Sequence, residues 1–203
     1  MKKISLFISA ALLSIAALAQ KHPPILGVKG GINLSSWNVD GAFQDQIDSR
    51  LGFHFGLIAH THITDQVALQ PELQFSSQGA KQNAGNGQDY VYRMNYINVP
   101  VMIQYMFDNG FRIEAGPQLG FLVGAKDVAP DGGEVTSTDD YKTVDAGVGL
   151  GINYLTYSGI GIGARYIFGL SNINDIGINK TQNRNLQLSL FYLLDKNHKR
   201  KSR

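Results

Sequence analysis

Six charged side chains carry most of the chemistry in this chain. Each lies in an alternating segment and shares its face of that segment with glycine, asparagine, glutamine or serine. The six are Lys29, Glu72, Arg112, Glu114, Asp145 and Arg165. Three are basic and three are acidic, and a charge removed from bulk water needs a partner because an unpaired buried charge is very costly. We therefore expect these residues to form ion pairs inside the protein.

Three histidines raise the question of catalysis or metal binding. His54 and His60 share the polar face of one alternating segment, the face expected to point into the protein, and His62 lies at a turn. No nucleophile elbow or HExxH pair accompanies them, and His60 and His62 lack a placed third metal ligand. The better interpretation is inert interior or turn histidines. We predict no catalytic, cofactor-binding or metal-binding residue, no cofactor and no enzymatic activity.

The elements that must position these residues are eight stretches in which apolar residues alternate with polar residues or glycine. They cover residues 26–35, 51–60, 67–76, 96–105, 111–121, 144–154, 160–169 and 185–192. Such alternation predicts β-strands. The polar face is too polar for the core of a soluble sandwich, and the apolar face is too apolar for a wet surface. This inversion favours a barrel with lipid outside.

The connections between these stretches are alternately short and long. Residues 63–66, 107–110 and 155–159 form tight turns, whereas residues 36–50, 79–88, 124–142 and 171–183 form longer polar loops. The sequence therefore predicts an all-β fold, an eight-stranded antiparallel up-and-down transmembrane β-barrel with short periplasmic turns and long extracellular loops. A barrel of this size has an interior just wide enough for side chains, so the six charges should fill it. A charged channel lining is the competing interpretation.

The chain ends indicate the compartment and the domain limits. Lys2 and Lys3 precede an apolar run that closes with Ala17-Leu18-Ala19, which is typical of a secretory signal. We expect residues 1–19 to be a cleaved signal peptide, residues 20–194 to be the barrel, and residues 195–203 to be a basic periplasmic tail. The chain has no cysteine, so a thiolate metal site and a lipoprotein anchor are excluded.

Five motifs carry a resemblance to a known family. They are Gly27-Val-Lys-Gly-Gly-Ile-Asn-Leu34, the run from Leu69 to Lys81, Tyr96-Ile-Asn-Val-Pro-Val-Met102, Glu114-Ala-Gly-Pro-Gln-Leu-Gly120, and the run from Ala164 to Ser171. In this order they resemble PorT-like small outer-membrane β-barrel proteins, a porin-like family. The resemblance implies location in the bacterial outer membrane, and the founding member is linked to a protein secretion and gliding apparatus. Relatives typically end on an aromatic residue, whereas here residues 195–203 follow Leu194.

Three functions stay open. The first is a structural or interaction role in the cell envelope, linked to a secretion apparatus as in PorT-like proteins. The second is a narrow porin-like channel for small solutes, and the third is a lipid-modifying barrel enzyme, for which no reactive residue is convincing. The expected partners are outer-membrane lipid and lipopolysaccharide, the barrel-assembly machinery, and envelope or secretion proteins that contact the extracellular loops. Nucleic acid is not expected.

An acidic loop is the last candidate site. Asp127, Asp131, Glu134, Asp139 and Asp140 lie within one long connection. They could hold a divalent cation, for example one that bridges lipopolysaccharide phosphates. Their spacing is not that of a calcium loop, so a solvated exterior loop is the favoured interpretation.

Overall fold

The structure is a computed structural model that describes residues 24–39, 46–83, 88–175 and 180–194. The expected signal peptide and basic tail lie outside these residues. The strands are β1 (Ile25–Val39), β2 (Ile47–His62), β3 (Val67–Asn83), β4 (Asp89–Met106), β5 (Phe111–Val128), β6 (Glu134–Thr136), β7 (Val144–Leu155), β8 (Ile160–Gly169) and β9 (Thr181–Leu193). A short 3-10 helix spans Thr138–Asp140. Over the described residues, no helix has the length and apolar character to cross a membrane.

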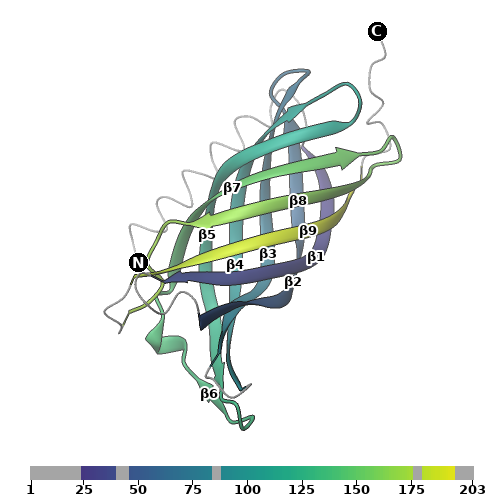
Figure 1. Ribbon diagram of the computed structural model, residues 1–203. Helices are drawn as coiled ribbons and strands as arrows, with labels where there is room; N and C mark the ends of the chain where they lie inside the picture. The colour runs from purple at the N-terminus through teal and green to yellow at the C-terminus, as the bar shows by residue number, and fades with distance from the viewer. Residues whose placement is uncertain (1–23, 40–45, 84–87, 176–179, 195–203) are drawn as a thin grey trace.

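Eight of the strands form a closed antiparallel ring (Figure 1). Consecutive strands pair with each other, β1 also pairs with β9, and the β4–β5 pairing completes the circle. At the end of the β1–β9 pair, the N–H of Leu194 donates to the carbonyl of Leu26 at 2.7 Å. A ring leaves no unpaired strand edge, which is the condition for a sheet in hydrocarbon. The predicted eight-stranded up-and-down barrel is confirmed.

The two faces of the wall match the predicted parity. Large apolar side chains such as Leu51, Phe55 and Ile162 point outward and are more than half exposed. Polar side chains at the alternate positions, including Asn33, Gln74 and Gln187, are completely buried. Polar residues are therefore inside the ring and apolar residues outside it, as in a barrel whose solvent is lipid.

The two ends of the barrel differ. At one end the turns are as short as predicted, and Gly110 and Gly159 take positive φ angles of 94° and 86° that side chains rarely adopt. At the other end the strands run further than predicted, so that β1 reaches Val39 and β3 reaches Asn83. Backbone pairing continues there, but the inward positions become apolar, as at Ala80 and Met94, while the outward positions carry charges such as Arg93. The alternation of outward apolar and inward polar residues that marks a strand in the sequence is therefore lost. We call these the turn end and the loop end.

A bulge in β5 shapes the loop end. Leu122 pairs with Tyr96 and Gly124 pairs with Asn95, so Val123 is an extra residue in β5. Beyond it Ala125 points inward, opposite Met94. The three-residue strand β6 pairs with the end of β5 and projects beyond the barrel wall (Figure 1).

Candidate functional site: the barrel lumen

The middle of the lumen holds an ion network centred on Arg165 of β8. Its Nη2 and Nη1 donate to the two carboxylate oxygens of Glu72 at 2.7 and 2.9 Å, and its Nε donates to Oε1 of Glu114 at 2.6 Å. Lys29 Nζ lies 3.4 Å from Oε2 of Glu72. These four side chains are at most 3% exposed. Two cations and two carboxylates thus form a neutral buried group.

Glutamine side chains complete the hydrogen bonding of the network. Gln70 Nε2 donates to Glu72 Oε1 at 2.8 Å, and Gln74 Nε2 donates to the other oxygen of Glu72. Gln104 Nε2 donates to Oε2 of Glu114 at 2.9 Å. Buried charges are stable only when their remaining lone pairs and protons are also bonded, and these amides meet that condition.

Two inward glycines of β7 make room for the network. A Cβ at Gly151 would lie 2.7 Å from Oε1 of Glu114, and a Cβ at Gly149 would lie 3.4 Å from Cδ of Arg165. The glycines that alternate along this strand therefore leave space for long charged side chains in a narrow interior.

Arg112 and Asp145 point inward as expected but form no salt bridge within the described part of the chain, which corrects the six-member network. Arg112 is buried and its Nη1 lies 3.5 Å from Oε1 of Gln104. Asp145 accepts from Ser171 Oγ and, at 2.8 Å, from Asn183 Nδ2. Glu114 pairs with Gly151 while Asp145 pairs with Gly120. Six residues, or roughly 20 Å along the strand, therefore separate Asp145 from the network.

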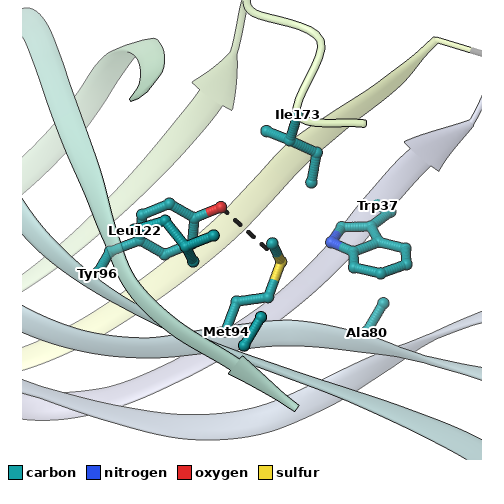
Figure 2. Close-up of a cluster of buried hydrophobic side chains, with 7 residues drawn as sticks. Trp37, Ala80, Met94, Tyr96, Leu122 and Ile173 are labelled. Atoms are coloured by element: carbon teal, nitrogen blue, oxygen red, sulfur yellow. Dashed lines mark hydrogen bonds between the residues drawn. The ribbon is translucent and has the colours of Figure 1, made fainter. Parts of the chain in front are cut away.

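An apolar cluster fills the lumen at the loop end (Figure 2). Its members come from four strands and one loop and are Trp37, Ala80, Met94, Tyr96, Leu122, Ala125 and Ile173. The Trp37 ring packs against Tyr92 with centroids 4.7 Å apart, and the Tyr96 hydroxyl donates to Sδ of Met94 at 3.8 Å. The sequence analysis did not foresee this loop-end cluster, because most of its residues lie beyond the predicted strands.

A second apolar cluster fills the turn end. It consists of Ile58, Leu155, Phe191 and Leu193, with Ile25 packed against it. Ile58 was the apolar exception on the inward face of its predicted strand, and this cluster explains it. That exception was the sequence signal for the turn-end cluster.

Buried amides surround the ion network and extend toward the loop-end cluster. Asn185 and Gln187 have both polar side-chain atoms without a hydrogen-bond partner among the described residues, and Asn98 Nδ2 and Gln118 Oε1 share this property. Buried amide groups of this kind bind ordered water in proteins. The middle of the lumen is thus polar, and both of its ends are apolar.

His54 lies in a hydrogen-bonded chain that the sequence analysis missed. Its Nδ1 is 2.7 Å from Oδ1 of Asn33 and its Nε2 is 2.9 Å from Oγ of Ser189. A Ser–His–Asn arrangement can activate a serine for acyl transfer, but all three residues are less than a tenth exposed. The sequence indicated only that these three residues point inward. Their contact depends on the β1–β9 register, which brings Asn33 and Ser189 near one another.

The other two histidines lie at the turn end. The rings of His60 and His62 make an edge contact with centroids 4.9 Å apart. Within the described residues, no three metal-ligating side chains of the His, Cys, Asp or Glu type come together. The acidic loop residues form no such group either, and the carboxylate of Asp127 accepts from Ser137 Oγ at 2.7 Å.

Comparison with known proteins places this barrel in a family. A family model described as "Outer membrane protein beta-barrel domain" matches residues 19–175. The chain belongs to this family. The family establishes the bacterial outer membrane as the location of the protein, with the turn end in the periplasm and the loop end outside the cell.

Solved structures support the same fold. Neisserial surface protein A is 14% identical, with a TM-score of 0.56, and the match covers 83% of this chain and 96% of that one. The attachment invasion locus protein Ail of Yersinia pestis is 13% identical, with a TM-score of 0.50 and coverage of 83% and 97%. A further structure contains Ail in complex with the heparin analogue sucrose octasulfate. A search of curated proteins gives no match.

Proposed function

We propose that this protein is a closed outer-membrane barrel with a structural or interaction role in the cell envelope. The observation that carries the proposal is the filling of the lumen. The Arg165 network occupies its middle, and an apolar cluster occupies each end. The barrel then serves as a rigid anchor that presents its extracellular loops to other molecules.

The end clusters favour this role over a narrow porin-like channel. The charged and amide side chains of the middle favour a channel, because such groups hold water. A solute would nevertheless have to cross both the loop-end and the turn-end cluster, in which the side chains are less than a tenth exposed. Apolar constrictions of this kind stop conduction by excluding water.

Planar-bilayer recording tests the closed lumen. Purified protein, shown to be folded by a mobility shift between unboiled and boiled samples, should give no stable conductance steps. The double variant Leu155→Ala and Phe191→Ala truncates two of the four residues of the turn-end cluster. It leaves the loop-end cluster intact and should also give no stable steps. Stable steps from the unmodified protein would contradict the closed lumen and favour the porin-like channel.

The resemblance to PorT-like proteins supports a finer proposal, contact with a secretion apparatus through the extracellular loops. The extension formed by the ends of β4 and β5 with β6 is the part of the described chain that projects furthest from the ring (Figure 1). Val135 of β6 is 66% exposed. A photo-crosslinking amino acid at this position should capture a component of the secretion machinery in living cells.

The matched control is the same crosslinker at Tyr157, which is 80% exposed in a periplasmic turn. Capture of the same component from Tyr157, or of no component from Val135, would argue against an extracellular interaction role. Neither result depends on whether the lumen conducts.

A lipid-modifying enzyme is the remaining alternative, and the Ser189–His54–Asn33 chain is the observation that favours it. A fluorophosphonate probe should label folded protein at Ser189 if that serine is activated and accessible, with the Ser189→Ala variant as control. Because Ser189 faces the closed lumen, we expect no labelling. Specific labelling would favour the enzyme.

A further inference from the structure

The described lysines and arginines fall into two groups. Lys29, Arg112 and Arg165 are buried in the lumen. All the others, among them Lys81 and Arg184, lie at the extracellular end of the barrel. Two of the three periplasmic turns carry an aspartate instead, Asp65 and Asp108. Among the described residues, the cations outside the lumen therefore lie at the extracellular membrane boundary.

The densest group of these cations is on the outer face of β3, β4 and β5. Arg93 and Lys126 are directly opposite each other in the β4–β5 register. Both point outward, because their neighbours Met94 and Ala125 are buried in the lumen. Lys81 lies one diagonal step away on β3, since Gly79 pairs with Arg93 and Lys81 pairs with Val91. We call Lys81, Arg93 and Lys126 the rim triad.

One carboxylate serves two of these cations. Glu134 of β6 lies 3.0 Å from Nη1 of Arg93 and 2.9 Å from Nζ of Lys126. Asp127, the next residue on β5, instead accepts from Ser137 Oγ, and burial raises its pKa. Like charges placed directly opposite on a sheet repel each other. Asp48 of β2 is directly opposite Lys81. With Glu134 and Asp48 included, the rim triad keeps a surplus of one positive charge, and displacement of Glu134 raises this to two.

The height of the rim triad matches a layer of lipid headgroups. Val123, which is 56% exposed, is an outward apolar residue of β5, and Lys126 follows three positions later. Three residues span roughly 10 Å along a strand, and strand tilt of about 45° reduces this to roughly 7 Å above the apolar band. The polar headgroup layer of a membrane has about this thickness.

We infer that the rim triad binds a phosphate group of lipid A in the outer leaflet. A phosphate oxygen at this site can accept from Arg93 and Lys126 in place of the Glu134 carboxylate, while Lys81 neutralises its second charge. Glu134 is then the internal counter-ion that holds the two cations together until the lipid binds. The inference requires the outer-membrane location but not the closed lumen.

Binding of lipid A to full-length protein in detergent micelles tests this inference. Thermophoresis should show that the double variant Arg93→Gln and Lys126→Gln binds lipid A at least tenfold more weakly than the unmodified protein. Glu134→Gln should bind it several-fold more tightly, because the competing carboxylate is gone. Lys180→Gln, which removes an extracellular lysine outside the triad, should leave binding unchanged. A heat-induced mobility shift confirms that each variant is folded.

Three comparisons identify the ligand. Lipid A from which both phosphates have been removed should bind as weakly to the unmodified protein as lipid A binds to the double variant. Equal binding of phosphorylated and dephosphorylated lipid A would overturn the inference. Tighter binding of inorganic phosphate or of a sulfated polysaccharide than of lipid A would also overturn it, as would equal effects of the double variant and Lys180→Gln.

Discussion

The lumen and the extracellular rim contain the same motif, one carboxylate shared by two cations, in opposite surroundings. In the lumen Glu72 lies between Arg165 and Lys29, and in the rim Glu134 lies between Arg93 and Lys126. The contact distances overlap, from 2.7 to 3.4 Å in the lumen and 2.9 to 3.0 Å at the rim. The side chains are at most 3% exposed in the first case and at least 41% exposed in the second.

This difference in exposure determines what each motif can do. A buried charge that loses its partner has no water to replace it, so the lumen network must stay complete for the barrel to be stable. An exposed pair competes with water and salt and contributes little to stability. The two cations of the rim can therefore exchange the Glu134 carboxylate for another anion. The buried network therefore stabilises the barrel, whereas the exposed cations of the rim are suited to binding a ligand.

Removal of the central arginine should have the largest effect on stability. Arg165→Met leaves Glu72 and Glu114 buried with Lys29 as their remaining partner in the network, and we expect a loss of about 3–5 kcal/mol in the free energy of unfolding. Fluorescence of Trp37, the single tryptophan of the chain, measures this during urea titration in lipid vesicles. Arg93→Met at the rim is the matched control, with an expected change within about 0.5 kcal/mol.

A rescue experiment sharpens this prediction. Adding Glu114→Gln to Arg165→Met leaves Lys29 and Glu72 as a neutral buried pair and should restore part of the lost stability. Equal losses for Arg165→Met and Arg93→Met would break the distinction between the buried and the exposed motif.

Loss of the second lumen cation should be less damaging. Lys29 Nζ lies 3.4 and 3.5 Å from the oxygens of Glu72, which keeps both hydrogen bonds from Arg165. Lys29→Met should therefore cost about 1.5–3 kcal/mol, the usual range for hydrogen bonds to charged groups. The same urea titration checks the value. A loss as large as that of Arg165→Met would show that charge neutrality, rather than bidentate geometry, governs the network.

The tight filling of the periplasmic end can be tested with a single methyl group. A Cβ at Gly161 would lie 2.2 Å from Cζ of Phe191, so Gly161→Ala should cost about 1–3 kcal/mol through overpacking. Gly124→Ala is the matched control, since a Cβ there meets no atom within 4 Å. Combining Gly161→Ala with Phe191→Leu should recover stability. No loss for Gly161→Ala would mean that this end is loosely packed.

The strands were predictable because lipid imposes a strict two-residue period on residues that cross the membrane. The prediction ended where that period ends, and so β6 and the extracellular parts of β1, β2, β3 and β5 were taken for loops, while Tyr90 to Asn95 of β4 stayed ambiguous. Parity also placed all six lumen charges correctly on the inside. The alternation does not give the position of a side chain along the barrel axis, which follows from the register between neighbouring strands. Arg165 reaches Glu72 across the lumen for this reason, whereas Asp145 is paired six residues from the network.

The rim motif should respond to acid although it contributes little to stability. The hydrogen bond and the charge of Lys126, together with the charge of Arg93, hold the pKa of Glu134 below its ordinary value of 4.5. The favourable contact is therefore complete above pH 4.5 and is lost as the pH falls through the lowered pKa. Hydrogen exchange at the amides of β6, corrected for the intrinsic rate, should accelerate between pH 5 and pH 3, whereas β7 and β8 should stay protected. The Glu134→Gln variant should show fast exchange at β6 over the whole range, and a variant that kept the acid response would exclude Glu134 as its source.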